Sequence, residues 1–450
     1  MQINQNITKN ISLYNPWYQD KTFLFLEKKY NKRKQYYSVK KYLDKELIIS
    51  IVGLRRAGKT TIIRQIINSL LKKTAKKQIF FYQFDEENFD LEAKLDFYFQ
   101  NILKNDIYKA KCYIFLDELQ NVPNWQVVLK KYYDINKEIK FVVSGSTHLY
   151  LHKNTKESLA GRIINIDIHP FGWHEFLNFK YGKNYDFFKN VFDDNFLETA
   201  KDNRDILLYK KDFKTFLSYG EYPYFFHEAN AFELDKYFKD SILDKIFARD
   251  INLFDIDNHS AFFQLFKVLS KDSAQEINLQ NISREIGLNV ITIKRYIGIL
   301  EKMFLYYYIY KYSKNIRQQI KSFKKGYVSS LNLSRVSLNI DYWDMNSDQY
   351  GHIVETFIYN EMIKNSIDNI NFYHNTKIKK EVDFIITNNK KIIPIEVKIS
   401  KQINKAHLKN LAYFMESNKI SNGILFYGGE EIKTIKINKL KIDCLPYFMV

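Results

Sequence analysis

One stretch of this sequence has the residue types and spacing that bind phosphate groups. Residues 53–60, GLRRAGKT, fit the pattern G-x-x-x-x-G-K-[ST] between an apolar run at 47–52 and an amphipathic helical pattern. The glycines let the backbone curl so that N–H groups point at phosphate oxygens, and the helix N-terminus adds a positive dipole end. Lys59 would reach the β- and γ-phosphates, and the Thr60 hydroxyl would bind Mg²⁺. The predicted nucleotide-binding residues are Gly53, Leu54, Arg55, Arg56, Ala57, Gly58, Lys59, Thr60 and Thr61.

Acidic and hydroxyl residues at two strand ends would complete this nucleotide site. Asp117 and Glu118 follow the apolar run CYIFL. Ser144 and Ser146 follow the next apolar run, FVV. Asp117 would hold Mg²⁺ through water, and Glu118 would polarise the water that attacks the γ-phosphate. The serines are candidates for a γ-phosphate sensor on the neighbouring strand, and the alternative is simple turn chemistry.

A second group of charged residues lies near the C-terminus. The runs EVDFII and IIPIEVK predict the two strands of a hairpin. Because residues i and i+2 point the same way, Asp383 on the first strand and Glu396 and Lys398 on the second would present one charged face. Asp383 and Glu396 are predicted metal ligands, Lys398 would help to orient a hydrolytic water, and Glu355 on a preceding helix could add a ligand. The alternative is the solvent face of a hairpin, where alternating charge is normal.

Alternating strand and helix patterns must position the nucleotide-binding residues. From residue 47 to 170 they predict a parallel sheet covered on both faces, which is the α/β architecture of a P-loop NTPase. Before it, residues 1–46 contain a basic aromatic segment. This segment predicts a helix packed against the ATPase core, with nucleic-acid contact as the alternative.

The rest of the chain divides into three predicted parts. Aromatic amphipathic patterns at 171–275 predict a helical lid, and residues 276–339 predict a winged-helix-like module that contains a helix-turn-helix at 281–304. DNA contact and plain packing both remain open for this module. If the module binds DNA, four residues of its second helix would face a groove or the DNA phosphates. These residues are Thr292, Lys294, Arg295 and Tyr296. Residues 340–450 predict an α/β nuclease-like domain built around the charged hairpin.

The composition limits the class of protein. The net charge of +18 favours an acidic partner, with nucleic acid first and an anionic membrane surface second, although an AT-rich coding sequence would also enrich lysine. Two cysteines, Cys112 and Cys444, cannot form a disulfide framework, which indicates a reducing compartment. The first residues lack a signal-peptide core, and no apolar run reaches the roughly 20 residues of a membrane span. We therefore expect a cytoplasmic protein without a membrane partner.

The segments GLRRAGKTT, FLDELQNVPNW, VVSGSTHLYL and ESLAGRI resemble, in order and spacing, bacterial and archaeal AAA-family ATPases related to the AAA+ and STAND groups. The resemblance implies that residues 53–61 bind ATP, that Asp117 binds Mg²⁺ and that Glu118 is the catalytic base. It also implies a sensor at Ser144 or Ser146. Arg162 matches a proposed arginine finger, which would act in trans within a homo-oligomer. The alternative is a surface role, because an arginine at the start of an edge strand is more often a surface residue.

The C-terminal pattern Glu355…Asp383…Glu396-x-Lys398 is similar to the restriction-endonuclease motif and to the C-terminal domain of unknown function in the same ATPases. Two positions depart from those relatives. Glu221 stands where they have glycine, and the segment KKGYVSSLNL lacks their acidic residue. The leading hypothesis is an ATP-hydrolysing AAA-family protein that acts on DNA and has a metal-dependent nuclease-like domain. The rivals are a nucleotide-dependent sensor or scaffold that cuts nothing, and a remodeller of protein partners.

Overall fold

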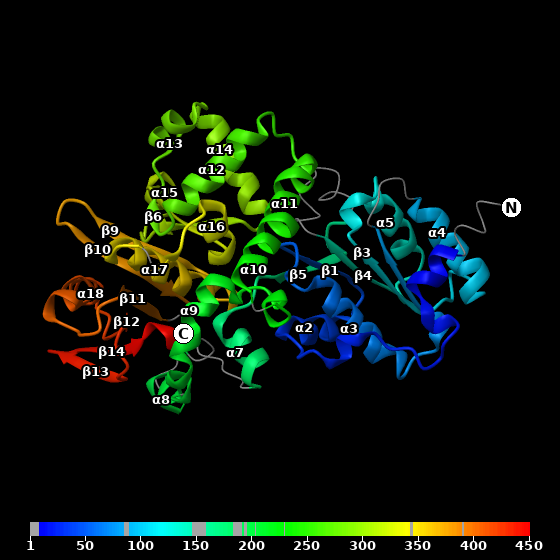
Figure 1. Ribbon diagram of the computed structural model, residues 1–450, viewed down its shortest axis with the longest axis horizontal. Helices are drawn as coiled ribbons and strands as arrows, with labels where there is room; N and C mark the ends of the chain where they lie inside the picture. Colours follow the sequence, from blue (N-terminus) through cyan, green and yellow to red (C-terminus); the bar gives the residue numbers. More distant parts are fainter. Residues whose placement is uncertain are drawn as a thin grey trace. The chain divides into compact units, whose positions relative to one another are not determined.

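The computed structural model (Figure 1) describes residues 9–84, 90–145, 159–182, 191–192, 196–202, 204–228, 230–342, 345–388 and 391–450. Backbone contacts divide the chain into two units, Met1–His169 and Pro170–Val450. The first unit therefore ends one residue before the predicted end of the ATPase domain.

The first unit is built on a five-stranded sheet whose strand pairs are all parallel, in the order β2-β3-β4-β1-β5. Its strands are β1 (Ile48–Gly53), β2 (Ile79–Gln83), β3 (Cys112–Asp117), β4 (Ile139–Gly145) and β5 (Ile163–Ile168). The central strands are buried apolar runs, as expected for a sheet covered on both faces. The predicted parallel P-loop sheet is confirmed, and β5 is an edge strand as expected.

Helices cover both faces of this sheet (Figure 1). The helices of the unit include α2 (Lys34–Tyr42), α3 (Lys59–Leu71), α4 (Leu91–Phe97) and α5 (Trp125–Ile135). The crossover from β1 to β2 runs across the sheet in one direction, and the crossovers to β3 and β4 run back. Because such crossovers are right-handed, α3 covers one face while α4 and α5 cover the other.

The N-terminal segment packs against this core. The side chain of Asn15 exchanges two hydrogen bonds of 2.8 Å with the backbone of Phe81 on the edge strand β2, and the Trp17 indole donates to the Ile79 carbonyl. These contacts satisfy backbone groups that an edge strand would otherwise expose. Farther along, α2 contacts α3 and β5.

The second unit begins with helices and continues with further helices and one sheet. Its helices include α7 (Trp173–Tyr181), α8 (Phe196–Asp202), α9 (Lys210–Thr215), α10 (Ala231–Tyr237), α11 (Asp244–Ala248), α12 (His259–Lys271), α13 (Leu279–Ile286), α14 (Val290–Lys302), α15 (Ile316–Lys321), α16 (Leu331–Leu338), α17 (Ser347–Lys364) and α18 (Lys405–Ser417). The predicted helical region at 171–275 is thus helical in the described residues. Within the parts of the chain that the structure describes, no helix is both long enough and apolar enough to cross a membrane.

The sheet of the second unit has nine strands in the order β13-β14-β12-β11-β10-β9-β7-β8-β6. The strands are β6 (Gln275–Glu276), β7 (Tyr306–Lys311), β8 (Lys324–Val328), β9 (Ile370–Asn375), β10 (Lys380–Thr387), β11 (Ile392–Lys398), β12 (Asn422–Tyr427), β13 (Lys433–Ile437) and β14 (Leu440–Pro446). The sequence predicts separate modules at 276–339 and 340–450. In the structure they share this sheet, because β7 pairs in parallel with β9.

The core that supports the charged hairpin lies between α18 and strands β10, β12 and β14. Leu411, Phe414 and Met415 of the helix pack against Ile385 and Leu425 of the strands, and all five side chains are buried. Burial of side chains of this size stabilises the fold by about 2 kcal/mol each, which fixes the strand ends that carry the charges.

Candidate functional sites

The phosphate loop leaves β1 at Gly53 and enters α3 at Lys59. Gly53 has a φ of +154°, and a Cβ there would lie 2.0 Å from the Ile168 carbonyl oxygen of the neighbouring strand β5. Gly58 has a φ of +99°, in the left-handed region, and serves as the N-cap of α3. A side chain at Gly53 would force the strands apart, and one at Gly58 would strain the turn into the helix.

Lys59 is buried inside the loop. Its Nζ donates hydrogen bonds to the carbonyl oxygens of Gly53, at 3.0 Å, and Leu54, at 2.9 Å. An ammonium held by the loop's own carbonyls lies where a phosphate bound to the loop would need a positive charge. Among the other predicted loop residues, Leu54 and Ala57 are buried, while Arg56 is exposed with a φ of +62°. Arg55 and Thr61 are partly buried.

Thr60 and Asp117 meet at the end of the loop, where the Thr60 hydroxyl donates to Asp117 Oδ2 across 2.6 Å. Ser144 at the end of β4 donates its hydroxyl to the other oxygen, Oδ1. Burial, with the charge of neighbouring Glu118, raises the pKa of Asp117 above its ordinary value. A carboxylate in this position would be stabilised by a cation, so the residues present fit Mg²⁺.

Glu118 follows Asp117 with a φ of +55°, so the chain leaves the extended conformation of β3 at this residue. Its backbone N–H lies 3.4 Å from Ser144 Oγ, and its Oε2 accepts a hydrogen bond of 2.5 Å from the Gln120 amide. The structure thus brings Thr60 and Ser144 together at Asp117, and Ser144 also lies near the backbone of Glu118. Ser146 lies outside the described residues.

Arg162 lies at the opposite end of the sheet from the phosphate loop. Its carbonyl accepts from the N–H of Ile48, the first residue of β1, whereas the loop follows the last residue, Gly53. The five-residue strand step corresponds to about 17 Å. The Arg162 guanidinium pairs with Asp134 of α5 at 2.8 Å. Within one chain, Arg162 is therefore a surface ion-pair partner and does not reach the chain's own phosphate loop.

One loop contact was missed by the sequence analysis. Arg33, in the basic segment before α2, is buried and donates to the carbonyls of Ala57 at 2.7 Å and His169 at 3.0 Å. These hydrogen bonds connect the phosphate loop to the residue that follows β5. The signal available in the sequence was an arginine among lysines, which alone does not separate a buried cation from a solvated one.

The four C-terminal charged residues converge on one cavity. Glu355 of α17, Asp383 of β10, and Glu396 and Lys398 of β11 line a cavity of about 810 Å³. The cavity is further lined by Ala274, Gln275, Glu276, Lys325, Ser347, Asp348, Gly351, His352, His374, Glu381, Val397, Ile399, Ser400, His407 and Asn410. The predicted shared face of the hairpin therefore faces a cavity, and the carboxylates of Glu355, Asp383 and Glu396 are buried.

Asp383 and Glu396 differ in the hydrogen bonds that their carboxylate oxygens accept. The pairing of β9 with β10 shifts register between Val382 and Ile385, and Asp383 lies within this irregularity. A bulge re-aims side chains, and Asp383 Oδ2 accepts a hydrogen bond of 2.8 Å from the Val397 N–H. Glu396 Oε1 accepts from Lys398 Nζ at 2.6 Å, whereas its buried Oε2 has no hydrogen-bond partner among the described residues.

Burial shapes the ionisation of this cluster. It raises the pKa of Glu396 to about 8, helped by the charge of Asp383, and it raises the pKa of Glu355 to about 7. Burial lowers the pKa of Lys398, but the carboxylates of Asp383 and Glu396 outweigh it, so that this pKa lies above its ordinary value. A buried carboxylate with an unpartnered oxygen is a suitable ligand for a cation.

Lys325 of β8 is a second lysine in the cluster that the sequence analysis did not identify. Its Nζ lies 2.8 Å from Glu355 Oε1 and 3.1 Å from Glu381 Oε1. The Tyr327 hydroxyl also donates to Glu355 Oε1, at 2.8 Å. Within the described ranges, no three His, Cys, Asp or Glu side chains are grouped so as to hold a metal ion. The metal at Asp383 and Glu396 therefore stays a prediction.

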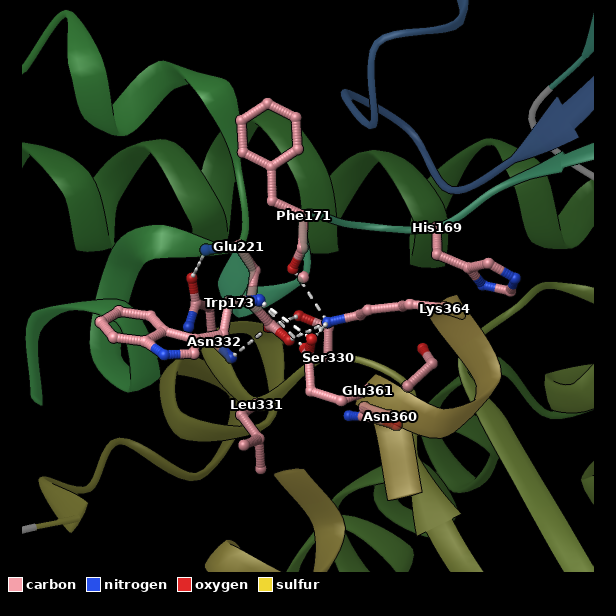
Figure 2. Close-up of polar contacts among 12 residues, drawn as sticks. His169, Phe171, Trp173, Glu221, Ser330, Leu331, Asn332, Asn360, Glu361 and Lys364 are labelled. Atoms are coloured by element: carbon pink, nitrogen blue, oxygen red, sulfur yellow. Dashed lines mark hydrogen bonds and ion pairs between the residues drawn. The ribbon is translucent and has the colours of Figure 1, made fainter. Parts of the chain in front are cut away.

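A second buried charged cluster anchors the helix that carries Glu355. Figure 2 shows Lys364, near the C-terminal end of α17, reaching toward Glu221 and the carbonyl of Phe171, at 3.3 Å and 2.9 Å. Both oxygens of Glu361 accept hydrogen bonds of 3.1 Å from the Trp173 N–H at the start of α7. The second oxygen of Glu221 accepts from Ser330 and Asn332. Glu221 thus completes a polar network that contacts α17 through Lys364.

The predicted helix-turn-helix is α13 and α14, joined through Gly287 with a φ of +74° and capped by Asn289. Lys294 and Arg295 are exposed, and Arg295 pairs with Asp257 at 2.7 Å. Tyr296 does not point outward as predicted. It is buried against Phe262 of α12, because it lies on the apolar face of α14. Thr292 is partly buried, and its backbone N–H donates a hydrogen bond to Oδ1 of the N-cap residue Asn289.

Comparison with protein families assigns parts of the chain. Residues 45–177 match the family described as an AAA domain. Residues 210–341 and 350–446 match two domains of unknown function, DUF8612 and DUF4143. The last match covers the charged hairpin, and its description carries no fold or activity.

Similar proteins span most of the chain. An uncharacterized protein of Methanocaldococcus jannaschii, MJ1637, is 26% identical, with 96% of this chain and 91% of the relative covered. A second from that organism, MJ1544, is 25% identical over 88% of this chain and 86% of the relative. An uncharacterized protein of Haemophilus influenzae is 24% identical over 84% of this chain and 89% of the relative.

Two solved structures show limited overall similarity to this chain. The Walker-type ATPase of Pyrococcus abyssi is 13% identical with a TM-score of 0.43, covering 70% of this chain and 97% of that one. AMPPCP-bound DnaA from Aquifex aeolicus is 16% identical with a TM-score of 0.26, covering 64% and 92%. The family match, the phosphate-loop motif and the parallel strand order carry the assignment. They support an AAA-family P-loop ATPase domain in the first unit of this chain.

Proposed function

We propose that this protein binds and hydrolyses ATP with Mg²⁺ in its first unit and uses that cycle to act on DNA. The observation that carries the proposal is the hydrogen-bonded set at the ends of β3 and β4 and the start of α3, in which Asp117 accepts from both Thr60 and Ser144. The AAA-domain match over residues 45–177 supports it.

Each residue of this site has a role that its position supports. Lys59 would exchange its carbonyl partners for β- and γ-phosphate oxygens, and the loop N–H groups would bind the remaining phosphate charge. Mg²⁺ held through Thr60 and Asp117 would neutralise charge that develops on the phosphates. Glu118 would orient and deprotonate the attacking water, and Ser144 would report the γ-phosphate to the end of β4. Catalysis in trans by Arg162 would need a homo-oligomer.

Two features support DNA as the partner. The net charge of +18 favours a polyanion. The element order α12, β6, α13, α14, β7, β8, with β6 and β7 each antiparallel to β8, is that expected of a winged helix. Exposed Lys294 would contact the DNA backbone from the second helix of the pair.

The second unit is proposed to contain a metal-dependent nuclease-like site. The order α17, β9, β10, β11, α18, β12, with β11 parallel to β12 after the crossover helix, supports a restriction-endonuclease-like arrangement. Asp383 and Glu396 would hold a divalent cation, which would activate water, and Lys398 would orient that water. The unpartnered Oε2 of Glu396 supports a cation there.

One observation favours the alternative, a nucleotide-dependent sensor or scaffold whose second unit binds a partner without cleavage. Lys325 and Lys398 already compensate the carboxylates that a catalytic metal would use. Substitution of Lys398 by alanine separates the two proposals when a DNA-cleaving activity is present. An activity that survives this substitution would place the cleavage site elsewhere.

The test of the lead proposal is ATP hydrolysis by the full-length protein with and without duplex DNA. Turnover stimulated by DNA, and lost in Lys59→Ala and Glu118→Gln, is the expected result. Lys72→Ala, which changes an exposed lysine just after α3, is the matched control and should keep wild-type turnover. Tight ATP binding with negligible turnover, indifferent to DNA, would favour the sensor or scaffold.

A further inference from the structure

We propose that the ammonium group of Lys325 occupies a second cation position in the charged cavity, so that the cavity accepts one divalent metal ion instead of two. This inference rests on the proposed metal site at Asp383 and Glu396. It assigns a role to a residue of β8, a strand outside the hairpin that carries that site.

Lys325 has the surroundings of a bound cation. Its side chain is only 4% exposed, and its Nζ lies 2.8 Å from Glu355 Oε1, 3.1 Å from Glu381 Oε1 and 3.9 Å from Asp383 Oδ1. A divalent ion would sit among the same kind of oxygen atoms at about 2.0–2.6 Å.

The other side of the cavity has the opposite property. Glu396 is 3% exposed and lines the cavity, and its Oε2 has no hydrogen-bond partner within the described residues. Asp383 lies between the two sides. Its Oδ1 faces Lys325, and its Oδ2 accepts from the N–H of Val397, the residue after Glu396. One carboxylate cluster therefore has a filled cation position at Glu355 and an unsatisfied oxygen at Glu396.

The formal charges agree with a single metal ion. The cavity is also lined by Glu276, which pairs with His374, and by the exposed Asp348. Closer to the two lysines, the carboxylates of Glu355, Glu381, Asp383 and Glu396 face the ammonium groups of Lys325 and Lys398, which leaves a charge of −2 around these lysines when all six groups are ionised. One divalent cation neutralises this charge. A second would leave an uncompensated positive charge in a buried site, which is costly. Removal of the Lys325 charge removes that obstacle and leaves Glu355 with the Tyr327 hydroxyl but without its ammonium partner.

Binding of Mn²⁺ alone tests the inference in the full-length protein. Free Mn²⁺ is measured by electron paramagnetic resonance without nucleotide, in an Asp117→Asn background that removes the proposed metal ligand of the first unit. Lys325→Met should bind one more Mn²⁺ ion per chain than the same background with Lys325. Lys324→Met is the matched control, because Lys324 contacts the rings of Tyr308 and Tyr310 and does not line the cavity. It should add no ion.

The outcomes separate this inference from the metal site on which it rests. A folded Lys325→Met variant with no additional ion would overturn the role of Lys325, as would two ions in the Lys325 background that Asp383→Asn removes. No ion in that background would instead refute the proposed metal site. If the methionine variant does not fold, Lys325→Gln replaces it, since the glutamine amide can still donate to Glu355 while lacking the charge. The same gain of one ion is expected.

Discussion

Thr60 and Asp117 are 57 residues apart in the chain, and the hydroxyl of the first donates to a carboxylate oxygen of the second across 2.6 Å. The contact exists because β1, β4 and β3 are neighbours in a parallel sheet, so that their carboxyl ends meet at one edge. Ser144 from the middle strand completes the set. In open α/β sheets, ligands bind at this edge, where helix N-termini and strand ends converge.

Glu118→Gln should separate nucleotide binding from hydrolysis. Glutamine keeps the shape of the side chain and can still contact Gln120, but it cannot take a proton from water. We expect ATP affinity within about twofold of wild type and turnover lowered by about 10²-fold or more. Binding is measured by calorimetry and turnover by phosphate release. Glu138→Gln, at an exposed position before β4, is the control and should leave both unchanged.

Asp117→Asn should make nucleotide binding insensitive to magnesium. The substitution removes the charge that would attract Mg²⁺, while asparagine can keep the contacts with Thr60 and Ser144. We expect Mg²⁺ to raise the ATP affinity of wild type. In the variant, this increase should be smaller by about tenfold or more. Titrations with Mg²⁺ and with EDTA measure it. A full magnesium response in the variant would remove Asp117 from the metal site.

The nucleotide site was predictable because its signals are local. The phosphate-loop motif, the apolar runs and the acidic pair each lie within a few residues, and sheet topology brings them together. Lys325 and Glu221 were not predictable in this way. Lys325 finds its partners 30 to 58 residues farther along, at Glu355 and Asp383, and the sequence alone does not distinguish it from the many other lysines.

Periodicity was informative where it was followed closely. Tyr296 lies three residues after Ile293 and four before Leu300, and all three are buried on one face of α14. The sequence analysis included this side chain among those that would face DNA if the module binds it, although the helical spacing indicated the core. The fold of the second unit was harder to divide from sequence, because the pairing of β7 with β9 joins distant segments into one sheet.

Lys364→Met should destabilise the second unit. Lys364 is buried between Glu221 and Glu361, so its loss leaves two buried carboxylates without their counter-ion. We expect a loss of about 3 kcal/mol in the free energy of unfolding, measured by urea denaturation. Lys409→Met, at an exposed position of α18, should change it by less than about 0.5 kcal/mol. Adding Glu221→Gln to Lys364→Met should recover part of the loss, and no recovery would contradict the proposed pairing.

The two cysteine thiols should resist alkylation in the native protein. Burial raises the pKa of both Cys112 and Cys444 to about 12. Since the thiolate is the nucleophile, only about one thiol in ten thousand would be ionised at pH 8. Maleimide labelling followed by mass spectrometry should find both unmodified at pH 7 to 9 and both modified in denaturant. Rapid native labelling of either one would show that its strand opens, and the position of the label identifies which unit does so.

Arg162 offers a test of action between subunits. It lies about 17 Å along β1 from the loop of its own chain, so a catalytic contribution requires a second copy. Arg162→Ala retains its own Lys59 and Glu118, whereas Glu118→Gln retains the arginine. If the arginine acts in trans, each variant alone should hydrolyse ATP slowly, and an equimolar mixture should recover up to about a quarter of wild-type turnover, from those interfaces that combine an intact site with an intact arginine. Asp134→Asn, which removes only the ion-pair partner of Arg162, should remain active. A mixture no more active than its components, or wild-type turnover by Arg162→Ala alone, would leave Arg162 as a surface residue of the ATPase domain.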